Sequence, residues 1–129
     1  MPAAKDLKTL IVDDQRSVRA MIRSCLQGIG ITQVIEAEDG VQALDLLSTS
    51  PRHLIISDLN MPHLDGLGLL RAVRQNPETA KTAFIMLSGH ADTELVRKAV
   101  ELGVNNYIVK PFTVESLRRK ITAVFGQLT

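Results

Sequence analysis

The sequence holds little of several residue types, and each shortage excludes a kind of protein. Cys25 is its single cysteine, so no disulfide can form within the chain, and the sequence fits a reducing compartment. Tryptophan is absent and aromatic residues make up 3%, too few for a surface that stacks on nucleotide bases. The net charge of +1 also argues against a general electrostatic attraction to nucleic acid. We therefore expect no nucleic-acid partner.

Long hydrophobic runs are missing as well. No apolar segment approaches the roughly 20 residues that a bilayer-spanning helix needs. The N-terminal segment MPAAKDLK lacks the apolar core of a secretory signal peptide. The sequence therefore predicts a cytoplasmic protein without a membrane partner.

The composition is that of one globular domain. The chain has 129 residues, of which 45% are hydrophobic and 22% are charged. At this length a domain buries roughly two thirds of the surface of its unfolded chain, so a stable core needs no disulfide. We expect residues 1–129 to form a single domain, and the protein to be a monomer.

Five short apolar segments are spaced along the chain and predict five strands. They are TLIV (9–12), QVIEA (33–37), HLIIS (53–57), AFIML (83–87) and NYIVK (106–110). All but the second are nearly continuous in apolar character, which is typical of parallel strands covered on both faces. The second is mixed, which indicates a strand at the edge of the sheet.

A helical pattern follows each of these segments. The first has apolar residues such as Val18, Ile22 and Leu26 at helical spacing, opposite a charged face. Asp39 and Thr113 are the expected N-caps of the second and fifth helices. The expected helices cover residues 15–30, 39–48, 65–75, 92–103 and 113–128. Five βα units with right-handed crossovers predict an α/β fold of the flavodoxin-like class, with a doubly wound, five-stranded parallel sheet in the order 2-1-3-4-5.

Polar side chains stand at the carboxyl ends of four of the predicted strands. Asp13 and Asp14 follow the first strand, Asp58 the third and Ser88 the fourth, and Lys110 ends the fifth. Ligands of such sheets bind beyond the carboxyl ends of the strands, near the point where the strand order reverses. Each residue alone could be a helix cap, a turn residue or a solvated charge. Because all five are expected at one end of one sheet, the sequence favours a binding site.

The charges of this expected site suggest a metal ion. Three carboxylates in one pocket repel one another and are costly to bury without a partner. A divalent cation together with Lys110 would balance them, and Mg²⁺ prefers oxygen ligands and shares its coordination shell with phosphates. An aspartate is also a competent nucleophile toward a phosphoryl group. Mg²⁺, Lys110 and the Ser88 hydroxyl could neutralise and position that group.

Four segments, LIVDDQ, IISDLNMPHLDG, LSGHAD and YIVKPF, closely resemble the receiver domain of bacterial two-component response regulators. The resemblance runs from about Leu7 to Leu128 and is strongest to the single-domain chemotaxis regulators. It implies that Asp58 accepts a phosphoryl group from a histidine kinase. It also implies that Asp14, Asp58 and the backbone carbonyl of Asn60 bind Mg²⁺, and that Asp13 acts on the metal through a water molecule.

The same resemblance implies roles for the remaining site residues. Lys110 would contact the phosphoryl oxygens, and its peptide bond to Pro111 would be cis. Gly66 would help to shape the loop after the third strand. Ser88 would move to donate a hydrogen bond to the phosphoryl group, and Tyr107 would swing inward as Ser88 moves.

The resemblance further implies that phosphorylation alters one surface of the protein. This output face is built from the helix over 92–103, the strand over 106–110 and the helix over 113–128. The residues expected on it are Val96, Glu101, Asn105, Thr113 and Lys120. The expected partners are a histidine kinase or histidine phosphotransferase upstream and a separate output protein downstream, such as a flagellar motor switch. The sequence does not choose between motility control, a phosphorelay and kinase regulation.

The sequence departs from the family pattern in two places. Gly89 and His90 follow Ser88, where the chemotaxis regulators have a small residue and then an acid. The second of these positions tunes hydrolysis in the family, so the lifetime of the phosphoryl group stays open. Gly68 stands where glutamate is common.

Three other functions compete with that of a signalling receiver. A small Mg²⁺-dependent phosphohydrolase with Asp58 as nucleophile usually needs an acid two residues on, where Asn60 stands, and a cap domain for which the chain has no room. A flavodoxin-like cofactor carrier would need a glycine-rich loop where DDQRS is acidic. A receiver-like protein that is never phosphorylated would not need this full set of polar residues. We therefore expect no enzyme beyond the protein's own phosphoryl transfer and autodephosphorylation.

Overall fold

The five strands form one parallel sheet in the order β2-β1-β3-β4-β5. The structure is a computed structural model that describes residues 2–89 and 93–129. The strands are β1 (Thr9–Val12), β2 (Val34–Ala37), β3 (Leu54–Asp58), β4 (Ala83–Ser88) and β5 (Asn106–Val109). The predicted strands, their order and the flavodoxin-like class are therefore confirmed.

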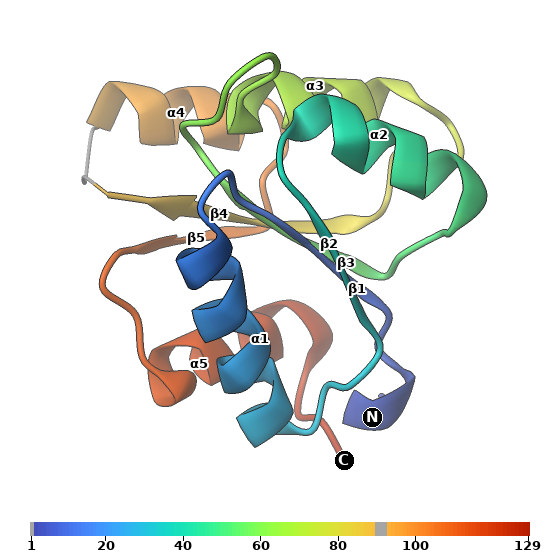
Figure 1. The fold of residues 1–129 in the computed structure, drawn as a ribbon, viewed down its shortest axis with the longest axis vertical. Coiled ribbons are helices and arrows are strands. Elements are labelled where there is room, and N and C mark those ends of the chain that lie inside the picture. Colours follow the sequence, from blue (N-terminus) through green and yellow to red (C-terminus); the bar gives the residue numbers. More distant parts are fainter. Residues whose placement is uncertain (1, 90–92) are drawn as a thin grey trace.

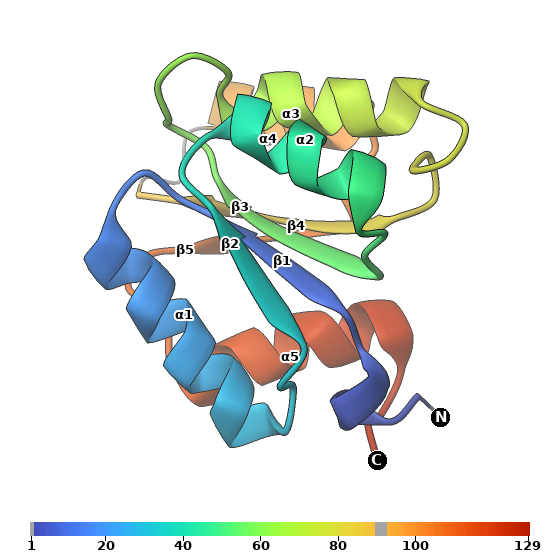
Figure 2. The same cartoon turned by 45° about the vertical axis from the view of Figure 1, so that its right-hand side comes forward.

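Five α-helices cover the two faces of this sheet. They are α1 (Arg16–Ile29), α2 (Gly40–Thr49), α3 (Gly66–Gln75), α4 (Thr93–Glu101) and α5 (Val114–Phe125), and a short 3₁₀ turn, η1 (Ala4–Asp6), precedes β1. Helices α1 and α5 lie on one face, and α2, α3 and α4 lie on the other (Figure 1). The turned view separates the three layers (Figure 2). In the part of the chain that the structure describes, no helix has both the length and the apolar character to cross a bilayer.

Two apolar cores result, one on each face of the sheet. Side chains alternate along a strand, so Ile11 and Ile56 pack beneath α1 and α5. Their neighbours Leu10 and Ile55 pack beneath α2, α3 and α4. Because the central strands are apolar on both sides, they are buried throughout, as their continuous apolar runs predicted.

Local signals explain where several helices begin and end. The Asp39 side chain accepts a hydrogen bond from the Gln42 N–H, and the Thr113 side chain accepts one from the Ser116 N–H, so both predicted N-caps are confirmed. Helix α1 ends at Ile29 and is followed by Gly30, whose φ of 99° is in the left-handed region that favours glycine.

The structure departs from the sequence prediction at β5. Its apolar run predicted a strand covered on both faces, yet only Ile108 is buried, and its neighbour Tyr107, which points to the other face, is 36% exposed. The fifth helix also stops at Phe125, short of the predicted end at 128, before Gly126 with its φ of 81°. An apolar run shows that side chains avoid water, but it does not show which neighbour covers them.

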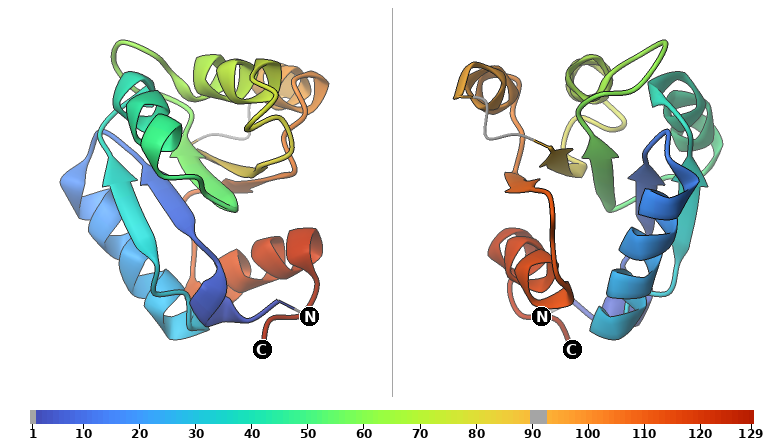
Figure 3. Two further views of the ribbon diagram at one scale, coloured as in Figure 1. Left: turned by 90° about the vertical axis from the view of Figure 1, so that its right-hand side faces the viewer. Right: turned by 60° about the vertical axis from the view of Figure 1, so that its left-hand side comes forward.

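The two ends of the chain lie side by side at the amino ends of the strands (Figure 3). The Thr129 carbonyl accepts a hydrogen bond of 3.1 Å from the Ala4 N–H, and the Thr129 N–H donates one of 3.0 Å to the Pro2 carbonyl. The polar residues singled out in the sequence lie at the opposite edge of the sheet, where the strands end.

Candidate functional site

Three aspartates meet at the carboxyl ends of β1 and β3. Asp13 follows β1, Asp58 ends β3, and the two strands are adjacent, with Val12 paired to Ser57. Carboxylate oxygens of Asp13, Asp14 and Asp58 lie within 4.8 Å of one another. Asp13 and Asp58 are buried, whereas Asp14 is exposed. Oxygen ligands at this spacing, with one of them open to solvent, fit a hard cation such as Mg²⁺.

Lys110 brings a positive charge into this acidic pocket. Its ammonium nitrogen lies 3.3 Å from Asp58 Oδ1 and 3.5 Å from Asp13 Oδ2. The end of β5 is fixed there, because the Lys110 N–H donates a hydrogen bond of 2.7 Å to the Ser88 carbonyl. The Lys110–Pro111 peptide bond is cis, as the resemblance implied. One ammonium among three carboxylates still leaves two negative charges, which matches the charge of Mg²⁺.

The pocket resists full ionisation of its two buried acids. Burial raises the pKa of Asp13 above its ordinary value, more than the Gln15 N–H and the Lys110 charge lower it. Burial also raises the pKa of Asp58, and repulsion from Asp13 adds to it, against the lowering by Lys110. A bound cation would relieve this cost, so the electrostatics favour metal binding.

Asp13→Asn is expected to raise the melting temperature of the protein in metal-free buffer, by on the order of 4 °C. Because the pKa of Asp13 is raised, the folded protein holds that proton more tightly than the unfolded chain, and ionised Asp13 costs stability above the raised pKa. Asparagine keeps the acceptor for the Gln15 N–H without the charge. The gain should shrink as the pH falls from the raised pKa toward the ordinary value of 3.8, where wild-type Asp13 takes up its proton.

Thermal unfolding followed by circular dichroism, in neutral and in acidic buffer, measures this gain. Asp45→Asn is the matched control, because Asp45 is exposed on α2. A melting temperature of Asp13→Asn equal to or below that of the wild type at neutral pH would contradict the repulsion in the pocket.

The loop after β3 is folded tightly behind Asp58. The Gly66 N–H donates a hydrogen bond of 2.9 Å to the Leu59 carbonyl. A Cβ atom at Gly66 would overlap the Asp58 carbonyl oxygen and lie 2.7 Å from the Met86 sulfur. Glycine is therefore required there, in line with the loop-shaping role that the resemblance implied. Asn60, two residues beyond Asp58, lies exposed in this loop.

The same loop is hydrogen-bonded to the start of α2, a contact that the sequence did not reveal. His63 has a φ of 67°, and its Nδ1 lies 2.9 Å from Asp39 Oδ2. The Leu64 carbonyl accepts a hydrogen bond of 3.2 Å from the Gly40 N–H. The Asp39 side chain thus caps α2 and also holds the loop that carries Asn60. Asp39 was predicted as a cap, but nothing in the sequence pointed to its contact with His63.

The two residues of the expected switch lie on the neighbouring strands β4 and β5. Ser88 ends β4 and is buried, and it pairs with Val109 in the sheet. The Tyr107 ring is partly exposed, with the Lys120 ammonium 5.4 Å from its centre. Tyr107 therefore lies in an outward, solvent-exposed position, beside the side chain of Lys120 from α5. His90, two residues beyond Ser88, lies outside the described residues.

Two residues of the expected output face have structural contacts of their own. The Asn105 side-chain oxygen accepts hydrogen bonds from the Phe84 N–H at 2.8 Å and from Arg74 Nη2 at 2.9 Å. Thr113 caps α5. Asn105 is exposed but tied to β4 and α3, so its side chain is less free to meet a partner than its position in the sequence suggested.

A parallel five-stranded sheet with three acids and a lysine at its carboxyl edge is the arrangement of a response regulator receiver domain. The family model described as "Response regulator receiver domain" matches residues 9–122, and the chain belongs to this family of two-component signalling proteins.

Individual relatives include chemotaxis proteins. The chain is 47% identical over 128 residues to the "Probable chemotaxis protein CheY" of Rhizobium etli, which covers 99% of both chains. It is 36% identical over 124 residues to the chemotaxis protein CheY-3 of Vibrio cholerae, with 96% of this chain and 95% of that protein covered. The solved structure of the chemotaxis response regulator CheY4 of Vibrio cholerae superposes with a TM-score of 0.84 at 33% identity, over 92% of this chain and 98% of that one.

Proposed function

We propose that this protein is a chemotaxis-type response regulator that accepts a phosphoryl group on Asp58 in a Mg²⁺-dependent reaction. The observation that carries the proposal is the position of the Asp58 carboxylate, at the end of β3, with the Lys110 ammonium 3.3 Å away and two further acids close by. The donor would be a histidine kinase or a histidine phosphotransferase. The names of the relatives support a role in chemotaxis.

The chemistry follows from the side chains around Asp58. An Asp58 oxygen would form the new bond to phosphorus while the phosphorus–nitrogen bond of the donor breaks, and the electron pair of that bond would return to the donor imidazole. Lys110 would contact an oxygen of the incoming phosphoryl group. Asp14, Asp58 and the Asn60 carbonyl would hold Mg²⁺, with Asp13 acting through a water molecule. When bound, the metal neutralises charge on the phosphoryl oxygens.

The direct test of this function is phosphorylation by a small donor. The protein is incubated with acetyl phosphate and Mg²⁺, quenched in acid, and weighed intact by mass spectrometry. We expect a gain of one phosphoryl group that is lost again as the acyl phosphate hydrolyses. A protein that gains no phosphoryl group under these conditions is not a phosphoacceptor of this kind.

The output would pass through the face formed by α4, β5 and α5 to a separate protein, such as a flagellar motor switch. Phosphorylation can bias this face only by interacting differently with two states that already exist. The outward Tyr107 would be one state, and an inward ring, following the movement of Ser88, would be the other. The single domain over 1–129, the monomeric state and the cytoplasmic location stay predictions.

Tyr107→Ala is expected to leave the rate of phosphorylation by acetyl phosphate close to that of the wild type. It should remove most of the gain in affinity for the output protein that phosphorylation brings, because the switch loses its ring. Both quantities can be measured once a pull-down with phosphorylated protein has identified that partner. Met21→Ala, which trims an exposed side chain on α1, is the control. A full wild-type gain in the Tyr107 variant would make Tyr107 a packing residue only.

A further inference from the structure

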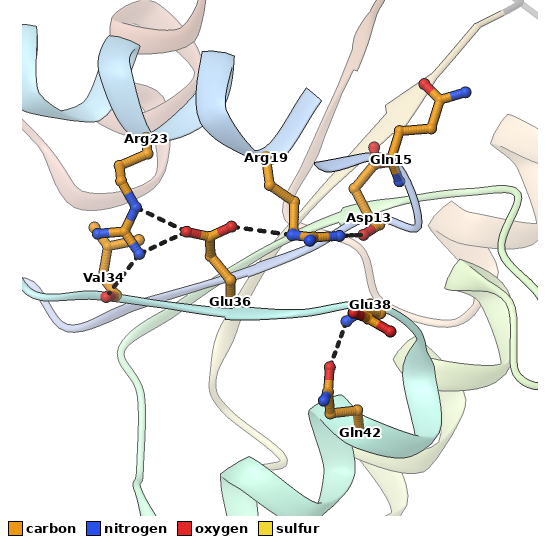
Figure 4. A network of polar contacts seen from close by, with 8 residues as sticks. All are labelled: Asp13, Gln15, Arg19, Arg23, Val34, Glu36, Glu38 and Gln42. Atoms are coloured by element: carbon orange, nitrogen blue, oxygen red, sulfur yellow. Dashed lines mark hydrogen bonds and ion pairs between the residues drawn. The ribbon is translucent and has the colours of Figure 1, made fainter. Parts of the chain in front are cut away.

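A buried arginine lies directly behind the acid pair, and neither the sequence patterns nor the proposed chemistry uses it. Arg19 belongs to α1 and is only 9% exposed. Its Nη1 donates a hydrogen bond of 2.6 Å to the backbone carbonyl of Asp13, and its Nε donates one of 3.0 Å to Glu36 on β2 (Figure 4). The guanidinium therefore bridges the loop after β1 and the neighbouring edge strand.

The carbonyl that Arg19 holds belongs to the peptide group between Asp13 and Asp14. A peptide group is planar, so fixing its oxygen also fixes the direction in which the Asp14 N–H and Cα leave it. The Asp13 N–H is held on the other side by a 3.1 Å hydrogen bond to the Ala37 carbonyl. The Asp13 side chain in turn accepts a hydrogen bond from the Gln15 N–H. Together with these contacts, the hydrogen bond from Arg19 fixes the backbone from which the exposed Asp14 side chain projects.

The arginine is itself held in place by a charge network. Glu36 accepts hydrogen bonds from Arg19 at one oxygen and from Arg23 at the other, the latter at 2.8 Å. Partial burial raises the pKa of Glu36, but the hydrogen bonds from Arg23 and Arg19 outweigh it, so the pKa lies below its ordinary value and Glu36 stays ionised. A planar guanidinium fixed at one edge by a carboxylate presents its other donors in a set direction.

Burying this charge is not the simplest way to fill the space between α1 and β2. A buried ion pair costs desolvation, and apolar residues of similar volume often stabilise a fold as well or better. What an arginine adds, and an apolar residue cannot, is the hydrogen bond to the Asp13 carbonyl. We propose that Arg19 is a positioning residue that orients the Asp13–Asp14 peptide group for Mg²⁺ binding, which rests on the metal-dependent function proposed above.

Arg23 provides a matched control within the same network. It pairs with the same glutamate as Arg19, but its Nη2 donates a hydrogen bond of 3.4 Å to the Val34 carbonyl on β2 instead of to the acid pair. Arg23→Met therefore removes an arginine from Glu36 without removing a hydrogen bond from the acid pair. Arg19→Met removes both the ion pair and the bond to the Asp13 carbonyl.

The test measures the dissociation constant for Mg²⁺ by titration calorimetry on proteins shown by circular dichroism to be folded. We expect Arg19→Met to raise this constant by roughly tenfold, as the loss of a residue that orients a metal ligand does. Arg23→Met should stay close to the wild-type value. Phosphorylation of Arg19→Met by acetyl phosphate should be slow at low Mg²⁺ and return toward the wild-type rate in excess Mg²⁺.

Each outcome separates this inference from the proposed function. A wild-type protein that binds no Mg²⁺ overturns the proposed function, and the role of Arg19 with it. A folded Arg19→Met with wild-type affinity, or a rate defect that excess Mg²⁺ does not restore, overturns only the role of Arg19. If Arg19→Met does not fold, Arg19→Lys takes its place, since lysine lacks the planar fork with which Arg19 reaches Glu36 and the Asp13 carbonyl from two different nitrogens. Wild-type affinity in that variant overturns the role equally.

Discussion

Asp58→Asn is expected to abolish phosphorylation by acetyl phosphate, down to the background of the assay. The Asp58 carboxylate ends β3 and lies 3.3 Å from the Lys110 ammonium, where an incoming phosphoryl group would meet both. Asparagine has nearly the same shape but is a poor nucleophile, so the pocket should stay intact while the reaction stops. The measurement is intact-mass spectrometry after acid quench, followed by mapping of the modified peptide in the wild type.

The control for this variant is an aspartate outside the pocket. Asp45 is exposed on α2, so Asp45→Asn makes the same chemical change without touching the site and should be phosphorylated like the wild type. Asp58→Asn should also remain folded. Burial raises the pKa of the Asp58 carboxyl group, so its negative charge is unfavourable in the fold, and the variant removes that charge. If Asp58→Asn is still phosphorylated to the wild-type level, Asp58 is not the phosphoacceptor.

Removing Mg²⁺, or the Asp14 carboxylate that would bind it, is expected to have an effect nearly as large. Without the metal, three carboxylates and one ammonium leave a negative pocket that repels the phosphate of the donor. Excess chelator should therefore stop phosphorylation of the wild type. Mutation of a residue that only orients a metal ligand weakens metal binding by roughly 10- to 100-fold. Asp14→Ala removes a ligand itself, so it should weaken Mg²⁺ binding by more than that. Calorimetry and the phosphorylation rate as a function of Mg²⁺ concentration measure the two effects.

Asp14 suits this test because it is exposed and its loss should leave the fold unchanged. Asp6→Ala is the control, since it removes another exposed acid at the opposite end of the sheet. Full phosphorylation in excess chelator, or by Asp14→Ala at low Mg²⁺, would mean that the cluster of acids is not a metal site.

Most of the fold was predictable because it depends on patterns that neighbouring residues create. Continuous apolar runs separated by helical periodicity gave five βα units, and chain connectivity then left one common strand order, which the structure confirms. The aspartates after β1 and β3 were predictable for the same reason. A residue that directly follows a parallel strand must lie at the carboxyl edge of the sheet, whatever its side chain contacts.

What the sequence did not reveal are contacts between distant segments that leave no local pattern. The helical pattern of α1 is recognised by its apolar residues and would place a charged residue such as Arg19 on the exposed face. In the structure Arg19 is buried against β2. Asn105 looks like an exposed loop residue, yet its side chain holds the start of β4. The partial exposure of β5 was mispredicted because the apolar run does not show how completely the neighbouring helices cover Tyr107. Each of these depends on tertiary packing.

The pairing of Lys110 with Asp13 joins positions that are 97 residues apart, and this separation bears on how the protein folds. Strand β5, which carries Lys110 at its end, joins the sheet through β4. During synthesis, Asp13, Asp14 and Asp58 emerge from the ribosome well before Lys110, the residue that offsets part of their charge. Closing so long a loop is slow, since its entropy is lost before the contact forms. We therefore expect the complete pocket to assemble late in folding, and the repulsion among its carboxylates to oppose premature closure of the β1 and β3 ends.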